Sequence, residues 1–187
     1  MSNFLEGTID FIKTNLNNTT QRPLHIGEAM TLWTYSILLD EANAFCYIGK
    51  NTSDDQDIQK MLKDSIKNCA EQSNDVKQLM IKEGVPIPNA TPPKPNSDTL
   101  GVPYGTKMSD EEIANGLIAK EIAAINLCNG TLTQAIRNDV GAMFLKFYNE
   151  KVNSLFIVKT TMLERGWLKV PPSFAVTGHP NSSEGNK

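Results

Sequence analysis

The sequence lacks most of the features by which a chemical activity is recognised in a protein chain. Its 187 residues include 2 histidines and 3 cysteines, which are Cys46, Cys69 and Cys128. The cysteines are odd in number and widely separated, without metal-finger spacing, which favours reduced thiols in a cytoplasm-like compartment. The sequence has no glycine-rich phosphate loop, no Ser-His-Asp candidate and no dinucleotide-binding fingerprint. These absences favour a non-enzymatic protein, although they leave the question of an enzyme open.

An excess of one charge and a long hydrophobic run are also missing. A net charge of −3 gives no electrostatic reason to expect nucleic acid as a partner. No apolar run approaches the roughly 18 uncharged residues of a membrane span. The first residues are acidic where a secretory signal would be basic. We therefore expect a soluble, cytoplasmic protein with neither nucleic acid nor a membrane as its partner.

The sequence does contain long stretches of helical periodicity. Apolar residues recur at intervals of three and four, and nothing reads as a strand. Ser109 and Glu112 form a capping box, and Gly84 suits the position just after a helix. The pattern predicts an all-α protein with four long helices, over residues 26–49, 54–83, 109–136 and 139–165.

The connection between the second and third long helices is unusually long and rich in proline. Residues 85–107 contain six prolines, and such a segment is semi-rigid and extended, with a reach of roughly 75 Å. It could run the full length of a helical bundle. We predict a ferritin-like four-helix bundle with one crossover, in which the first and third long helices run parallel. Its expected organisation is a short N-terminal helical arm (1–19), the bundle (20–176) and a disordered tail (177–187).

Three charged residues fall in the middle of the predicted apolar stripes. They are Glu41 on the first long helix, Glu121 on the third and Lys151 on the fourth, whereas Glu28 is expected to point away. Counting about 1.5 Å per residue places the three at similar heights. An unpaired buried charge is costly, so we expect Lys151 to lie within salt-bridge reach of Glu41 or Glu121. This buried charge network of Glu41, Glu121 and Lys151 is the chemical feature that the sequence suggests.

A metal site built on Glu41 and Glu121 is the alternative to a structural ion pair. A di-iron carboxylate bundle needs Glu-x-x-His motifs on two helices, and neither His25 nor His179 follows a glutamate at that spacing. Lys151 would also add a positive charge beside the metal. No cofactor is therefore expected, although a metal ion remains possible at these two glutamates. A redox role for Cys69 and Cys128 is a more distant possibility.

Five ordered motifs resemble those of a known family. They are "LHIGEAMTLW", "GVPIPNATPPKP", "SDEEIANGL", "IRNDVGAMFLKF" and "ERGWLKVPPSF", which together span about residues 20–176. The sequence resembles an uncharacterised ferritin-like family of spore-forming Gram-positive bacteria, related to the coat F type of spore coat proteins. Many members carry the unit twice, whereas this chain carries it once. The resemblance implies the bundle fold and an association with the spore or its coat, and it implies no catalytic residues.

Two functions follow as hypotheses. The first is a non-enzymatic helical-bundle protein, associated with the spore or spore coat, that acts through protein-protein contacts. The second is a metal- or small-ligand-binding carboxylate bundle that uses Glu41 and Glu121. Other coat proteins are possible partners, and a homodimer is expected because the N-terminal arm has an apolar side that a lone bundle would leave uncovered. That side consists of Leu5, Ile9, Ile12 and Leu16.

Overall fold

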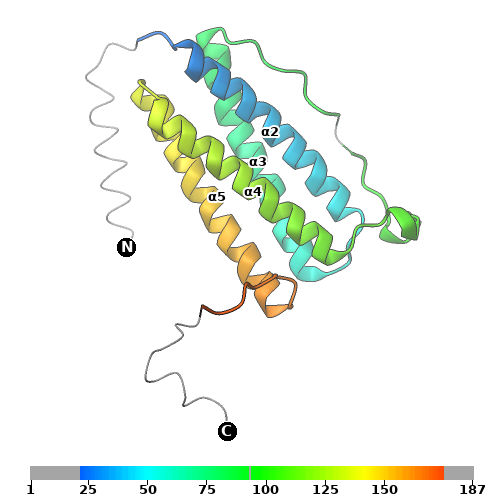
Figure 1. Cartoon of the computed structure of the whole chain (residues 1–187). Helices are drawn as coiled ribbons and strands as arrows, with labels where there is room; N and C mark the ends of the chain where they lie inside the picture. Colours follow the sequence, from blue (N-terminus) through cyan, green and yellow to red (C-terminus); the bar gives the residue numbers. More distant parts are fainter. Residues whose placement is uncertain (1–21, 93, 175–187) are drawn as a thin grey trace, which may run out of the picture.

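The protein is an all-helical bundle, in agreement with the predicted fold class. The computed structural model describes residues 22–92 and 94–174, and no strand occurs in this part of the chain. The predicted N-terminal arm (1–19), with its short helix, and the predicted tail (177–187) lie outside the described residues. The four long helices are α2 (Ile26–Lys50), α3 (Gln56–Glu83), α4 (Asp110–Gln134) and α5 (Asn138–Glu164) (Figure 1).

The helix ends lie within two residues of the predicted positions, because local capping chemistry fixes them. Ser109 and Glu112 form the predicted capping box at the start of α4. Gly84 adopts φ 71° after α3, a left-handed conformation that a residue without Cβ accepts at little cost. Helix α3 begins two residues later than predicted, because Asp55 caps it and accepts from the backbone amides of Asp57 and Ile58.

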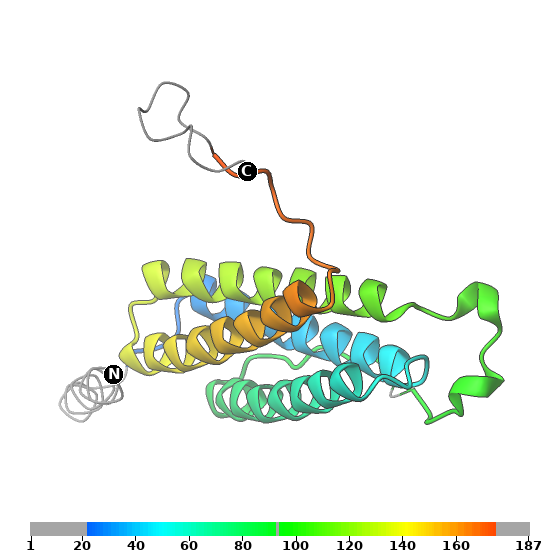
Figure 2. The same ribbon diagram turned by 90° about the horizontal axis from the view of Figure 1, so that it is seen from below.

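The helices form two antiparallel hairpins, α2–α3 and α4–α5, that pack against each other. The proline-rich segment connects the end of α3 to the start of α4 and runs the length of the bundle along its outside (Figures 1 and 2). A connection that crosses the whole length returns the chain to the end where α3 began, so α4 runs parallel to α3 and antiparallel to α2. The predicted parallel orientation of the first and third long helices is therefore wrong. Gly49 near the end of α2 accordingly faces Ile113 near the start of α4.

Polar contacts hold the crossover to the outside of α2 and to the α2–α3 turn. The Thr91 hydroxyl donates a hydrogen bond to the Glu41 carboxylate over 2.6 Å, and the Asn51 amide donates to the Pro95 carbonyl over 2.9 Å. Farther along, the Thr99 hydroxyl lies 2.8 Å from the Asp54 carboxylate. The segment is thus attached along its path, although among its described residues regular structure is limited to two short 3₁₀ turns, η1 (Thr99–Gly101) and η2 (Tyr104–Thr106).

Helix α2 presents its inner side at a different rotation from the one the sequence suggested. Its buried apolar positions follow a three-four spacing that includes Leu32, Tyr35, Leu39, Ala42 and Cys46. The large apolar residues of the predicted stripe instead reach the surface. Their exposed members are Ile26, Met30, Trp33 and Ile48. Because α2 is apolar on two sides, periodicity alone could not identify the side that faces the core.

The core consists of two apolar clusters, one toward each end of the bundle. The first centres on Tyr35, Phe144 and Phe147, whose rings lie 5.2 to 5.7 Å apart, a separation typical of favourable aromatic pairs. The second includes Leu62 of α3 and Leu117 of α4. Polar and charged side chains are buried in the middle of the bundle, and they form the candidate functional site.

Close packing of the two hairpins depends on a glycine in α4. A Cβ built on Gly116 would overlap the ring of Phe45 on α2. We predict that Gly116→Ala lowers the free energy of unfolding by about 1–3 kcal/mol despite the better helix propensity of alanine, because the clash forces the helices apart. Urea unfolding measures the effect. Gly130→Ala is the matched control, since its added Cβ would meet no atom within 4 Å, and equal stability of the two variants would contradict the prediction.

Candidate functional site

A buried glutamate with lysine neighbours occupies the middle of the bundle. Glu121 and Lys151 are 1% and 3% exposed, and the Lys151 amine lies 3.8 Å from Glu121 Oε2. The Lys120 amine contacts Glu121 Oε1 over 2.6 Å, and the Ser154 hydroxyl donates to the same oxygen over 2.9 Å. Lys151 therefore tolerates its inward position because a carboxylate from the neighbouring helix faces it.

Glu41 does not belong to this buried network. Its side chain is exposed on α2 and accepts the hydrogen bond from Thr91 in the crossover. The buried position next to it is Ala42, so the predicted phase of α2 was wrong by about one residue, or roughly 100°. The predicted network of Glu41, Glu121 and Lys151 is thus corrected to Glu121, Lys151 and Lys120, and the predicted metal pair of Glu41 and Glu121 does not come together.

Lys120 was not recognised from the sequence because it precedes Glu121 and falls beside the apolar stripe. Its side chain is 9% exposed. Burial acts to lower its pKa, but the nearby Glu121 carboxylate, and then Cys69 and Cys46, outweigh burial and raise it. Lys120 consequently remains an ammonium ion. Two lysine side chains share one carboxylate, and Glu121 Oε2 has no hydrogen-bond partner within the described part of the chain.

All three cysteines are buried, and none of them forms a disulfide. Cys69 Sγ lies 3.9 Å from the Lys151 amine, whereas Cys46 donates a hydrogen bond to the Ser65 hydroxyl over 3.3 Å. Burial raises the pKa of the Cys46 thiol and raises that of Cys128 to about 11. Cys46 and Cys128 are therefore uncharged thiols at neutral pH, and an amine accompanies Cys69.

A second polar chain connects the aromatic core to the surface. The buried Tyr35 hydroxyl donates to Gln72 Oε1 over 2.9 Å, and the Gln72 amide donates to Glu150 Oε2 over 2.7 Å. Burial raises the pKa of Tyr35, so its hydroxyl keeps its proton and acts as the donor. The three residues are far apart in the sequence, so only the tertiary structure brings this chain of contacts together.

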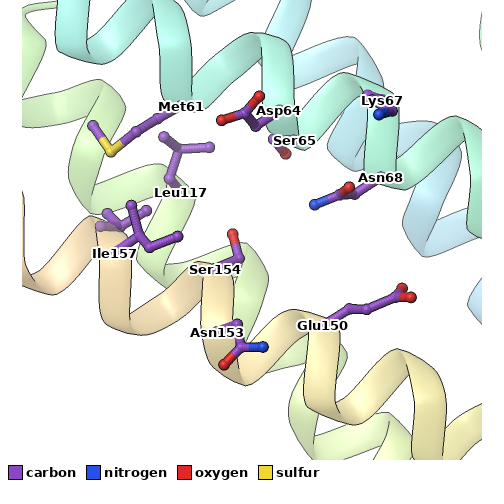
Figure 3. Close-up of a pocket in the computed structure, with 11 residues that line it drawn as sticks. Met61, Asp64, Ser65, Lys67, Asn68, Leu117, Glu150, Asn153, Ser154 and Ile157 are labelled. Atoms are coloured by element: carbon purple, nitrogen blue, oxygen red, sulfur yellow. The ribbon is translucent and has the colours of Figure 1, made fainter. Parts of the chain in front are cut away.

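A pocket opens between α3 and α5 beside the buried network. It has a volume of about 330 Å³, and these two helices pack together less closely than the helices within either hairpin. Ser65 and Asn68 line it from α3, and Glu150, Asn153 and Ser154 line it from α5 (Figure 3). Ser154 both borders the pocket and bonds to Glu121, so the pocket reaches the buried carboxylate through one hydroxyl.

A second buried carboxylate ties one end of the bundle together. Glu28 is 2% exposed, and its Oε1 accepts hydrogen bonds from the backbone amides of Ile136 and Arg137 over 2.9 and 2.8 Å. Its Oε2 accepts from the backbone of His25 over 3.1 Å, which completes a capping box at the start of α2. The prediction that Glu28 points away was wrong, and the His25-to-Glu28 spacing is the sequence signal that could have placed it.

Arg137 is the cation of this end cluster. Its guanidinium is 4% exposed and contacts the Glu83 carboxylate over 2.8 Å and the Asp139 carboxylate over 2.6 Å. It also donates to the Arg22 carbonyl over 3.2 Å. The hydrogen bonds that its guanidinium donates to Asp139 and then to Glu83 raise the pKa of Arg137, which stays charged. The Arg137 side chain thus joins the end of α3, the α4–α5 turn and the chain before α2.

The end cluster should make stability sensitive to acid. Burial alone would raise the pKa of Glu28, but the backbone hydrogen bonds from Arg137, His25 and Ile136 lower it overall. A carboxylate whose pKa is lowered on folding stabilises the protein above its unfolded pKa of about 4.3. That contribution is lost as the pH falls through the lower, folded value.

We therefore predict that Glu28→Gln weakens the loss of stability between neutral and acidic pH. Chemical unfolding of both proteins at several pH values from about 6 to 3 measures the difference, because the slope reports protons bound on unfolding. The variant should be less stable at neutral pH and should approach the wild type in acid. Parallel curves with a constant offset would contradict the assignment.

The geometry bears on metal binding as well. Within residues 22–92 and 94–174, no group of three or more His, Cys, Asp or Glu side chains is arranged to hold a metal ion. Glu121 faces two lysine amines, which disfavour a cation at this carboxylate. The arrangement is instead suited to holding α4 and α5 in register and to placing a thiol of α3 beside an amine of α5.

These features define a four-helix bundle protein with a lysine-flanked carboxylate in its interior. The chain belongs to the family described as "protein of unknown function (DUF3231)", whose model matches residues 13–179. It is 28% identical over 155 residues to the uncharacterized protein YvdQ of Bacillus subtilis, a match that covers 83% of this chain and 91% of that protein.

A solved structure is similar over nearly the whole bundle. The crystal structure of a "putative spore coat protein" from Bacillus halodurans matches with a TM-score of 0.79 at 26% identity, covering 83% of this chain and 98% of that chain. The similarity supports the all-helical fold and the order of its helices. In the described residues, no helix is both long and apolar enough to span a membrane.

Proposed function

We propose that this protein is a non-enzymatic, spore-associated bundle that acts through contacts with other proteins, including spore coat proteins. The observation that carries the proposal is the similarity to the Bacillus halodurans protein, which extends over 98% of that chain. Its coat description and the resemblance to coat F type proteins both favour a ferritin-like scaffold with a structural task. The cytoplasm of the sporulating cell would be its site of synthesis, and the spore or its coat its destination.

The outer side of α2 is the surface that we propose for self-association. Ile26, Met30 and Trp33 lie along it with exposed fractions of 89%, 58% and 36%. Apolar side chains exposed in a row are typical of protein interfaces. Because the row follows one helix, the same row of a second copy can pack against it across a two-fold axis. A charged face would instead place like charges opposite each other. A homodimer through this side of α2 follows from the proposal.

The proposed dimer is tested by Met30→Glu with multi-angle light scattering. Wild-type protein at micromolar concentration should give a dimer mass, and the variant should shift toward the monomer because two charges would meet at the interface. Ile81→Glu is the control, since Ile81 is 61% exposed on α3, and this variant should remain a dimer. A monomeric wild type would overturn the proposed self-association.

A second apolar surface on α5 would allow contact with a different coat protein. Phe156, Ile157 and Leu163 are 63%, 61% and 59% exposed, and α5 lies diagonally across the bundle from α2. A single self-complementary surface gives a dimer that cannot grow further. A second surface on the opposite side permits a larger assembly. The proposed role as a coat component uses both surfaces.

Association with the spore is tested by cell fractionation. An epitope-tagged protein, expressed from its own promoter in its native spore-forming host, should appear in the coat extract of purified spores. Phe156→Glu should reduce its amount there while leaving the dimer mass unchanged, because α5 is separate from the dimer surface. A protein found only in the vegetative cytoplasm would overturn the spore assignment.

Small-ligand binding in the α3–α5 pocket is a second candidate function. The observation that favours it is the buried Glu121 Oε2 atom without a hydrogen-bond partner in the described chain, close to a pocket of about 330 Å³. Glu41 has no part in it, since this residue lies on the outside. Elemental analysis of protein purified without chelators or an affinity tag tests the metal version, because a stoichiometric metal would favour this function over a purely structural one.

A further inference from the structure

Cys69 of α3 and Lys151 of α5 face each other across the boundary between the two hairpins. Their Sγ and Nζ atoms lie 3.9 Å apart, and the two residues are 1% and 3% exposed. The side chains come from helices that contact each other less closely than their hairpin partners do. A bond between these two atoms would therefore join the hairpins at a place where their helices pack loosely.

The surroundings of the three thiols differ in a way that selects Cys69. An oxidised cysteine can condense with a nitrogen nucleophile that lies beside its sulfur. Cys69 has the Lys151 amine beside it, whereas Cys46 donates to the Ser65 hydroxyl and the hydrogen-bonding neighbour of Cys128 is Tyr35. The protein thus carries one candidate reactive thiol and two internal controls of similar burial.

The α3–α5 pocket admits a small oxidant to the residues that adjoin this pair in the chain. Asn68, which precedes Cys69, lines the pocket from one side, and Glu150, which precedes Lys151, lines it from the other. Figure 3 shows these two side chains at the same end of the pocket. A hydroperoxide is small enough for a cavity of about 330 Å³, whereas larger thiol reagents would be excluded from the buried sulfur.

We propose that Cys69 and Lys151 form a covalent nitrogen–sulfur crosslink when the protein meets hydrogen peroxide. The Cys69 sulfur attacks one peroxide oxygen, the O–O bond breaks, and the leaving hydroxide takes up the thiol proton to become water. The sulfur is oxidised by two electrons to a sulfenic acid, and the peroxide is reduced. No other oxidant is required.

The second step uses Lys151 as the nucleophile. Glu121 Oε2, 3.8 Å from Nζ and without a hydrogen-bond partner in the described chain, accepts a proton from the lysine ammonium. The free amine attacks the sulfur, the S–N bond forms, the S–O bond breaks and a second water leaves. A sulfenamide results, as in the reaction of sulfenic acids with backbone nitrogen. The thiol, the amine and one hydrogen peroxide thus yield the crosslink and two waters.

Mass spectrometry of the folded full-length protein tests the proposal. After limited treatment of the folded protein with hydrogen peroxide, removal of the peroxide, and alkylation of the free thiols in denaturant, digestion should yield a linked peptide pair containing Cys69 and Lys151. Its mass should be lower than the sum of the free peptides by two hydrogen atoms, and a dithiol reductant should separate the pair. Cys46 and Cys128 should remain alkylated, and protein unfolded in denaturant should give no such pair.

Three variants distinguish the crosslink from a disulfide. Cys46→Ser and Cys128→Ser should retain the Cys69–Lys151 peptide pair, and Lys151→Arg should lose it. If Cys46→Ser or Cys128→Ser abolishes the crosslink, the product is a disulfide and the proposal fails. It also fails if wild-type Cys69 stays reduced or proceeds only to sulfinic acid. The wild-type digest locates the bond directly, so the test stays decisive even if Lys151→Arg folds poorly.

Discussion

Glu121→Gln is expected to lower the free energy of unfolding by about 3–5 kcal/mol, because it removes the carboxylate that two buried lysines share. The substitution keeps the size of the side chain and an oxygen for the Ser154 hydroxyl. It leaves the amines of Lys120 and Lys151, at 2.6 and 3.8 Å, without their anion. The loss would therefore come from charge rather than from packing, and urea or thermal unfolding measures it.

Substitutions within this network should lower the free energy of unfolding by unequal amounts. Lys151→Met should lower it less than Glu121→Gln does, because Lys120 still neutralises the carboxylate. The double variant should recover part of the loss seen in Glu121→Gln, since one uncompensated amine is removed. Glu41→Gln is the matched control: the same chemical change at an exposed position should leave stability nearly unchanged. Equal effects at the two glutamates would refute the buried charge network.

Arg137→Met is expected to have a comparably large effect, also about 3–5 kcal/mol, at the other end of the bundle. Arg137 contacts Glu83 and Asp139, and its removal leaves both carboxylates without their shared cation. Methionine retains the volume of the side-chain stem, so the measured loss would again report the ionic contacts. The thermal midpoint and the urea midpoint should both fall.

The matched control for this variant is Arg165→Met. Arg165 also contacts two carboxylates, those of Asp55 and Asp57, but its side chain is 40% exposed. Ion pairs that water reaches contribute little to stability, so this substitution should change the unfolding curve only slightly. A loss as large as that of Arg137→Met would mean that burial does not distinguish the two clusters.

The sequence alone determined the helices and much of the interior charge. Capping signals such as Ser109 and Gly84 act within a few residues, so the four helices end close to the predicted positions. Helices α4 and α5 each have one inward-facing stripe, which placed Glu121 and Lys151 in the core. The proline-rich crossover was recognised because its composition excludes regular structure and its length matches that of a bundle.

Only the tertiary structure decided which side of α2 faces inward and how the helices are oriented. Helix α2 is apolar on two sides, so its rotation depends on the neighbours that cover one of them, and this choice exposes Glu41 and buries Glu28. The direction of α4 depends on the crossover traversing the whole bundle, which periodicity does not record. Arg137 meets Glu83 across 54 residues of sequence. Such contacts arise from packing of distant segments, whereas sequence patterns report the preferences of near neighbours.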